Sequence, residues 1–353
     1  MLEKTRVTQF PDKINVCGHL TYLFFPILIF ALSFCSTAPG DPANTAPIVS
    51  AITINEFPVP TSGSSSYGIA AGPDGNLWFT EEGGNKIGRI TTAGVITEFS
   101  IPTGDSAPLG ITAGPDGNLW FAETLGNKIG RITTAGVITE FPIPTGDSSP
   151  FGITAGPDGN LWFTEITGNS IGRITTAGVI TEFPIPTAGT QPQGITVGPD
   201  SCLWFAEFAG NKIGRITTAG VITEFSIPTA SSYPKGITVG PDGCLWFAEF
   251  SSGKIGRITT AGVITEFSIP TANSYPVGIS VGPAGNLWFT EFASNKIAQI
   301  VVNAATIPIP EGQQSFMIEP PVVTPVIDTV PAQAKPIGIG PVAAGSVFVG
   351  YAV

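Results

Sequence analysis

The fold of this chain is decided by a stretch that reads GPDGNLWFAETLGNKIGRI at residues 114–132 and returns, with small changes, every 42 residues. The same spacing separates all six tryptophans of the chain, which are Trp78, Trp120, Trp162, Trp204, Trp246 and Trp288. A fixed period of this length is typical of proteins built from repeats that stack or close on one another. The sequence therefore predicts a repeat protein.

Each repeat contains four short apolar segments separated by turn residues. In one copy these segments cover residues 110–114, 119–123, 128–133 and 137–143, and Pro115-Asp116-Gly117 supplies the first turn. The 44 Gly, 33 Pro and 12% charged residues agree with many short strands joined by tight turns. Four antiparallel strands in 42 residues predict one blade of an all-β propeller.

The number of blades follows less directly from the sequence. The fourth-strand motif occurs once more than the tryptophan-bearing strand, because Ile54–Pro58 precedes the first full repeat. Residues 336–339 also match the first-strand motif at 276–279. We therefore expect seven blades within residues 51–353: six regular repeats over 62–310, a Pro-rich insertion over 311–334 and a degenerate blade over 335–353 that the N-terminal strand closes. The alternative is six blades plus a C-terminal tail.

The first 50 residues have a different composition. Lys4, Arg6 and Lys13 precede an uncharged apolar run from Leu20 to Phe34, which small residues follow. This pattern predicts an export signal over residues 1–35 and a tether over residues 36–50. Leu32–Cys35 is similar to a bacterial lipobox, so the alternatives are a lipid anchor on Cys35, simple secretion and a retained membrane anchor.

Charge and cysteine content restrict the partners. The net charge of −11 argues against nucleic acid, because no basic stripe could replace phosphate counterions. Contact with a membrane is expected only through the N-terminal anchor, and the chain is expected to be a monomer. Cys202 and Cys244 occupy equivalent positions in consecutive repeats, too far apart for a disulfide, so we expect two free thiols.

Differences between repeats are confined to two stretches. Repeats 104–145 and 146–187 agree at 36 of 42 positions. The differences fall in the loop between the second and third strands and around the connection from the fourth strand to the next blade; both should lie on one face, because strands alternate in direction. Loops on a rigid scaffold often carry binding residues. The expected binding residues on this variable face are Tyr67, Leu109, Phe151, Gln193, Tyr233, Lys235, Tyr275 and Val277. Drift of exposed loops after duplication is the alternative.

Two repeated residue types are interpreted as structural. The tryptophans are expected to pack blade against blade, because a large buried aromatic stabilises a core by about 3–5 kcal/mol. The Asp of each Pro-Asp-Gly turn is expected to serve the turn, since one carboxylate per turn is too few for calcium.

The run GPDGNLWF, followed by a Glu two residues on and by GNKIGRI, resembles the streptogramin B lyase (virginiamycin B lyase) family from Ile54 to about Pro310. The resemblance implies a seven-bladed propeller that opens a cyclic depsipeptide antibiotic by Mg²⁺-assisted elimination. It also implies catalytic histidines between Pro and Gly at the start of the first strand of a blade. The matching residues are Tyr67, Leu109, Phe151, Gln193, Lys235, Val277 and Ile337, none of them histidine.

The acidic residue of the family stands fourteen positions after that histidine. Here the spacing is kept by Glu81, Glu123, Glu165, Glu207, Glu249 and Glu291. These carboxylates are candidate metal ligands, with Glu249 and Glu291 the candidate catalytic carboxylates. The only histidine of the chain is His19, inside the expected signal. Elimination near neutral pH needs a group that exchanges a proton there, for which histidine is suited.

Three functions remain open. We expect first a non-catalytic, exported binding module that contacts a peptide, glycan or protein through the variable face and requires no cofactor. The second is a streptogramin B lyase-type enzyme that uses Mg²⁺. The third is a structural protein of the cell envelope.

Overall fold

The computed structural model describes residues 55–282 and 285–301 of the chain. Within these residues it has 23 β-strands and no helix, arranged as five four-stranded sheets and one three-stranded sheet. In every sheet the strands pair in chain order with antiparallel neighbours. Each sheet is one 42-residue repeat, which confirms the predicted all-β propeller.

The strands of the first three blades have the following bounds: β1 (Ser66–Ala71), β2 (Leu77–Glu81), β3 (Lys86–Ile90), β4 (Ile96–Ser100); β5 (Pro108–Ala113), β6 (Leu119–Glu123), β7 (Lys128–Ile132), β8 (Ile138–Pro142); β9 (Pro150–Ala155), β10 (Leu161–Glu165), β11 (Ser170–Ile174), β12 (Ile180–Pro184). Those of the last three blades are β13 (Pro192–Val197), β14 (Leu203–Glu207), β15 (Lys212–Ile216), β16 (Ile222–Ser226); β17 (Pro234–Val239), β18 (Leu245–Glu249), β19 (Lys254–Ile258), β20 (Ile264–Ser268); β21 (Pro276–Val281), β22 (Leu287–Glu291), β23 (Lys296–Ile300).

Turn chemistry fixes the ends of these strands. Gly117 adopts a left-handed φ of 73° and closes the β5–β6 turn, a conformation that glycine reaches without a steric penalty. Asp116 lies in the same turn and accepts a hydrogen bond of 3.0 Å from the indole Nε1 of Trp120. The predicted turn role of this Asp is confirmed, and it also satisfies the polar atom of a buried tryptophan.

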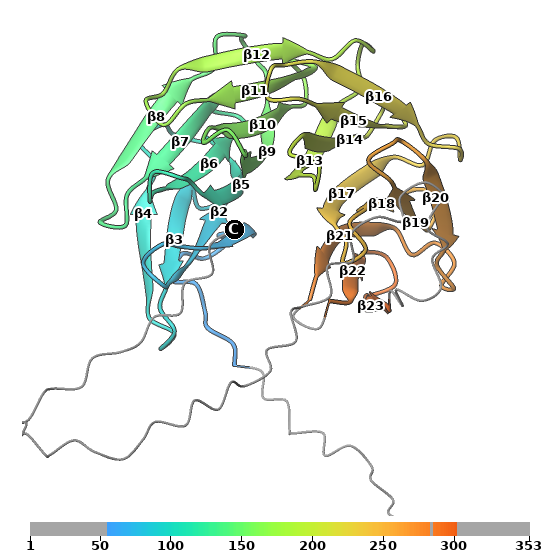
Figure 1. Ribbon diagram of the computed structural model, residues 1–353. Coiled ribbons are helices and arrows are strands. Elements are labelled where there is room, and N and C mark those ends of the chain that lie inside the picture. The colour runs from blue at the N-terminus through green and yellow to red at the C-terminus, as the bar shows by residue number, and fades with distance from the viewer. Residues whose placement is uncertain (1–54, 283–284, 302–353) are drawn as a thin grey trace, which may run out of the picture. The chain divides into compact units, whose positions relative to one another are not determined.

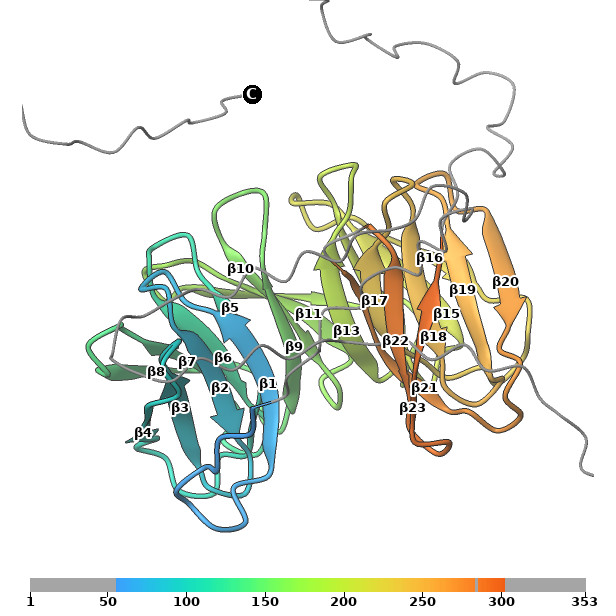
Figure 2. The same ribbon diagram turned by 90° about the horizontal axis from the view of Figure 1, so that it is seen from below.

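Successive blades contact one another through their first strands. Each first strand, from β1 through β5, β9, β13 and β17 to β21, lies against the next one in this order. Within the compact unit that starts at Pro58, Figure 1 shows these first strands on the inner side of the blades and β4, β8, β12, β16 and β20 on the outer side. Figure 2 shows the same strands seen from below, with the loops gathered at the ends of the strands.

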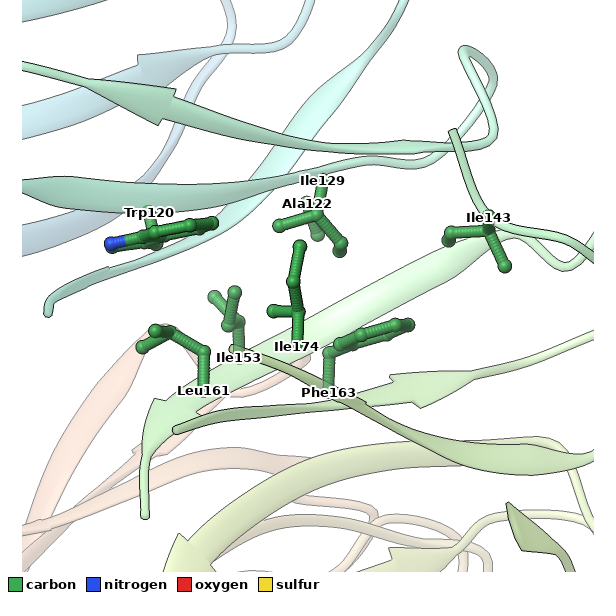
Figure 3. Packing of buried hydrophobic residues seen from close by; sticks show 8 residues of the cluster. All are labelled: Trp120, Ala122, Ile129, Ile143, Ile153, Leu161, Phe163 and Ile174. Atoms are coloured by element: carbon green, nitrogen blue, oxygen red, sulfur yellow. The ribbon is translucent and has the colours of Figure 1, made fainter. Parts of the chain in front are cut away.

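The core lies between neighbouring sheets, not within one. Trp120, Ala122 and Ile129 of the second blade pack against Leu161 and Phe163 of the third (Figure 3). The tryptophans of the first five blades are 0–3% exposed, whereas Trp288 of the last blade is 42% exposed. The predicted role of tryptophan in packing between blades is therefore confirmed for five repeats. Trp288 differs because no further blade lies beyond β23 among the described residues.

Several predictions concern the ends of the chain, at or beyond the limits of the described residues. The described residues form six blades, which matches the alternative of six blades plus a tail and does not confirm seven. Residues 55–58 of the expected N-terminal strand are not in a strand. The signal, the lipidation site Cys35, the tether, the insertion 311–334 and the degenerate blade 335–353 lie outside the described residues.

Two further observations concern composition. Cys202 and Cys244 are buried and free, as predicted. In the described part of the chain, no helix has the length and apolar character that a membrane span requires.

Candidate functional site

Backbone hydrogen bonds bring the two variable segments of each blade together. In the second blade, the amide of Thr124 after β6 donates to the carbonyl of Ala107 before β5 over 3.2 Å. Leu125 donates in the same way to Ser106. The loop between the second and third strands therefore lies against the connection that enters the same blade, and the predicted variable face is a single surface.

An asparagine side chain joins this surface from blade to blade. Asn85 adopts a left-handed φ of 54°. Its Nδ2 donates to the carbonyl of Thr103 over 2.8 Å, and its Oδ1 accepts from the amide and hydroxyl of Ser106. Asn127, Asn169 and Asn211 repeat the contact to the next connection. These contacts make the scaffold of the variable face rigid, so side chains displayed there have defined positions.

A β-bulge at the start of each first strand places the residues that match the family's histidines. In the second blade the pairing with β6 shifts register between Pro108 and Ile111, so Leu109 and Gly110 lie in the bulge. The other five blades have the same shift. Bulges redirect a side chain and are frequent beside functional sites. The six positions are therefore equivalent, and their side chains decide what each blade presents.

The first three blades present one aromatic contact. The ring of Tyr67, which is 54% exposed, meets the ring of Phe151 edge-on with centroids 5.9 Å apart. Leu109, between them in chain order, is buried at 8% exposure. Leu109 was also predicted for the binding face, and at this exposure it offers little surface to a partner.

A larger cluster lies on the fourth, fifth and sixth blades. The ring of Phe208 lies 5.0 Å from that of Tyr233, and the ring of Phe250 lies 5.1 Å from that of Tyr275. The two phenylalanines are 6.5 Å apart. Lys235 Nζ lies 4.0 Å from the ring centre of Phe250 and 5.4 Å from that of Phe208. Burial lowers the pKa of Lys235. We call these five residues the aromatic–lysine cluster.

The tyrosines of this cluster occupy a strained backbone position. Tyr233 and Tyr275 have φ values of 51° and 49°, in the left-handed region that bulky residues rarely adopt. The equivalent residues Ser65 and Ser149 have the same conformation, with φ of 48° and 53°. The scaffold imposes the backbone shape in every blade, so a small residue would suffice for the fold.

Part of the aromatic–lysine cluster was predicted from the sequence. It selected Tyr233, Lys235 and Tyr275 and missed Phe208 and Phe250, although phenylalanine follows the strand-end Glu in the last three repeats only. Gln193 and Val277, also predicted for the binding face, are half-buried in the bulges of β13 and β21.

The strand-end glutamates are buried beneath the variable face. Glu81, Glu123, Glu165, Glu207 and Glu249 are 0% exposed and Glu291 is 5% exposed. Burial, and next the nearby Glu140, raise the pKa of Glu123 to about 8. The pKa of Glu165 and of Glu207 is likewise raised to about 8, and that of Glu81 and of Glu249 to about 7. These five carboxyl groups, from Glu81 to Glu249, therefore hold a proton to a higher pH than an exposed glutamate does.

The glutamates do not converge on one point. Each lies at the end of the second strand of its own blade, and the described residues contain no group of three or more His, Cys, Asp or Glu side chains that could hold a metal ion. Residues 55–301 also lack histidine. The side chains present therefore do not fit the Mg²⁺ centre that the resemblance implies, and Glu249 and Glu291 remain catalytic candidates only by position.

Comparisons with known proteins agree with the architecture. The family described as the virginiamycin B lyase family matches residues 52–313. A virginiamycin B lyase of Bacillus licheniformis is 46% identical over 43 residues, which cover 12% of this chain and 15% of that protein. The match to this curated relative thus spans far less than two thirds of its length.

Solved structures match over a longer range. Virginiamycin B lyase from Staphylococcus aureus is 47% identical, with a TM-score of 0.65 over 69% of this chain and 87% of that one. A catalytically inactive histidine-to-alanine variant of the S. aureus enzyme with quinupristin is 48% identical, with a TM-score of 0.68 over 71% of this chain and 85% of that one. With its repeats, blades and family match in agreement, the chain belongs to the virginiamycin B lyase family.

Proposed function

We propose that this protein is an exported, surface-anchored β-propeller that binds a partner through its variable face and does not carry out lyase chemistry. The aromatic–lysine cluster is the observation that carries the proposal. Four aromatic rings, two of them beside one ammonium group, suit a peptide, a glycan or a protein surface, because aromatic residues supply large contact areas together with polar groups. Export and anchoring rest on the N-terminal pattern that ends at Cys35.

Random drift of exposed loops does not explain why aromatic residues from separate segments meet in this cluster. Phe208 and Phe250 belong to loops after β14 and β18, whereas Tyr233 and Tyr275 belong to connections before β17 and β21. Four separate segments therefore supply rings that touch one another and Lys235. Bulky residues at the two strained tyrosine positions are not needed for the fold, so selection for contact with a partner is the simpler reason for them.

The absence of histidine favours a non-catalytic role. The similar S. aureus structure with quinupristin is an inactive histidine-to-alanine variant, so that lyase depends on a histidine. This chain has only His19, inside the expected signal, and carries Lys235 and Val277 among the matching positions. A lysine whose ammonium lies 4.0 Å from the ring of Phe250 is engaged in a cation–π contact and poorly placed as a base.

Family membership favours one alternative, a Mg²⁺-dependent lyase. Glu249 has a pKa raised to about 7, which suits proton exchange near neutral pH. Its side chain is 0% exposed, however, and a general base must come within hydrogen-bond distance of the proton that it removes. Lyase activity would thus require a rearrangement that exposes Glu249 to the substrate, whereas partner binding requires no such change.

The binding proposal is tested with variants borrowed from other repeats. Tyr233→Ser and Tyr275→Ser copy Ser65 and Ser149, and the purified double variant is compared with wild type for retention of components from the envelope of the producing cell. Val221→Thr, at an exposed turn of the opposite face, is the matched control. Retention that is lost in the double variant and kept in the control supports the proposal. Equal retention by all three proteins contradicts it.

The lyase alternative has its own test. Wild-type protein is incubated with quinupristin and Mg²⁺, and the antibiotic is followed by chromatography and fragmentation, because elimination opens an ester ring without a change in mass. We expect the ring to stay closed. Ring opening that disappears in Glu249→Gln or Glu291→Gln would establish the lyase instead.

A further inference from the structure

The variable face carries its charges unevenly. The variable segments of the first three blades contain no lysine or arginine and three exposed acidic residues, which are Glu82, Asp105 and Asp147. Those of the last three blades contain Lys235 and no acidic residue. The segments compared are 62–67, 82–85, 104–109, 124–127, 146–151 and 166–169 in the first three blades, and 188–193, 208–211, 230–235, 250–253, 272–277 and 292–295 in the last three. An anionic ligand is therefore attracted to the last three blades and repelled by the first three.

Lys235 is the one described lysine without an ion pair or a hydrogen bond. Of the others, four form ion pairs with glutamates and one donates to a threonine hydroxyl: Lys86, Lys128, Lys212, Lys254 and Lys296. Within residues 55–282 and 285–301, the Lys235 ammonium makes cation–π contacts with Phe208 and Phe250. Burial is the one cause of its lowered pKa, and no carboxylate acts against it. The protein thus supplies a cation and leaves its anionic partner to a ligand.

The two phenylalanine rings leave the ammonium group able to bind an anion. An ammonium group has three N–H donors, and a ring face attracts a cation without accepting all of them. Lys235 is half-buried, so an anion that pairs with it is held more strongly than on an open surface, where water screens the charges. A hydrogen bond between an ammonium group and a carboxylate is among the strong ones in proteins. Lys235 is therefore suited to recognise a carboxylate.

The arrangement of the rings favours an apolar side chain over a sugar. The planes of Phe208 and Phe250 are inclined to one another by 48°. Each phenylalanine is also inclined to its neighbouring tyrosine, by 44° for Tyr233 and by 50° for Tyr275. A sugar ring stacks flat on an aromatic face, and inclined rings offer it no common plane. An apolar side chain need not be flat and can contact both phenylalanines at once.

We propose that the aromatic–lysine cluster binds an acidic peptide segment, in which a carboxylate pairs with Lys235 and an adjacent apolar side chain packs against Phe208 and Phe250. This inference rests on the proposed binding function and adds the chemistry of the partner. Ser231, Ser251 and Asn273 are exposed and flank the cluster in the sequence, so they offer uncharged hydrogen-bond groups to the peptide backbone.

The repeats provide matched variants for the test. Lys235→Gln copies Gln193 of the fourth blade. Lys86→Ser copies Ser170 of the third blade and removes the same charge from the first blade, away from the cluster. Two fluorescent peptides with blocked ends, Phe-Glu-Phe and Phe-Gln-Phe, are titrated with each protein and followed by fluorescence polarisation. Thermal unfolding checks that each variant folds.

The expected result is a preference for the acidic peptide that depends on Lys235. Wild type should bind Phe-Glu-Phe about 10–100-fold more tightly than Phe-Gln-Phe, as for a hydrogen bond to a charged group. Lys235→Gln should bind both peptides with the affinity that wild type has for Phe-Gln-Phe, and Lys86→Ser should behave as wild type. If Lys235→Gln does not fold, Lys235→Val, which copies Val277, takes its place.

Several outcomes would overturn the inference. Wild type might not bind Phe-Glu-Phe at about 1 mM, or might bind both peptides equally. The preference might also survive in folded Lys235→Gln. An oligosaccharide of uronic acids that binds through Lys235 more tightly than Phe-Glu-Phe does would replace the peptide by a glycan.

Failure of this inference differs from failure of the proposed function. Retention of envelope components that is lost in the Tyr233→Ser, Tyr275→Ser double variant but unchanged in Lys235→Gln would contradict the acidic peptide alone. Retention that is unchanged in the double variant would contradict the proposed function itself.

Discussion

Two sets of carboxylates lie at opposite ends of the second strands of the blades, and their surroundings shift their pKa values in opposite directions. At the turn before β6, burial alone would raise the pKa of Asp116, but hydrogen bonds from Trp120 and Asn118 outweigh it and hold the pKa below its usual value. At the other end of β6, burial raises the pKa of Glu123 to about 8, and neither oxygen has a hydrogen-bond partner.

The contrast separates carboxylates that stabilise the fold from carboxylates that cost stability. Asp116 stabilises the turn and satisfies a buried indole on the face where all repeats look alike. Glu123 lies beneath the variable face and costs stability whenever it is ionised. A buried carboxyl group with a raised pKa that recurs in five described blades is a candidate for function, although ion-pair networks can shift pKa values too.

The largest expected effect is a loss of stability as the pH rises from about 5 to about 8. The five glutamates ionise more readily in the unfolded chain than in the folded one, so the folded state holds extra protons. Stability should therefore fall as pH rises from about 4.5, the unfolded value, to about 8. A pKa difference of one corresponds to ~1.4 kcal/mol, and five glutamates with only that difference contribute ~7 kcal/mol. The Tm, measured from pH 4 to 10, should decrease steeply above about pH 5.

Glutamine substitution checks the cause of this loss. Glu123→Gln keeps the shape of the protonated side chain and cannot ionise, so it should leave the Tm unchanged at pH 5 and raise it at pH 9. A Tm that is flat from pH 5 to 9 in the wild type would mean that water reaches these carboxylates. In that case the two sets of carboxylates would not differ as the structure indicates.

A smaller effect is expected at the aspartates. Asp116→Ala leaves the buried indole N–H of Trp120 without its acceptor, which should lower the free energy of unfolding by about 1–3 kcal/mol in urea at pH 7. The last repeat already carries Ala284 at this position, and its Trp288 is 42% exposed rather than buried. Unchanged stability in Asp116→Ala would show that neither the turn nor the indole depends on this carboxylate.

Most of the fold could be predicted from the 42-residue period, because each blade repeats the same turn residues and the same strand pattern. From the sequence alone, the four strands of a blade, the packing of the tryptophans and the single variable face could all be predicted. The number of blades was harder, since the tail differs so much from the consensus. Contacts between repeats could not be predicted: nothing in the spacing showed that Phe208 would touch Tyr233 of the next blade, or that Leu109 would be buried while Tyr67 stays exposed.

The smallest effect on stability should come from the residues that matter most for binding. Tyr233→Ser replaces a tyrosine at φ 51° with the residue that Ser65 supplies at φ 48° in the first blade, so the backbone keeps its shape. We expect the free energy of unfolding to change by no more than about 0.5 kcal/mol, as for surface substitutions. Partner retention should nevertheless fall. If urea unfolding shows a loss of about 2 kcal/mol instead, the contact between Tyr233 and Phe208 is part of the core. The aromatic–lysine cluster would then belong with the aspartates, as structure, and the variable face would need another explanation.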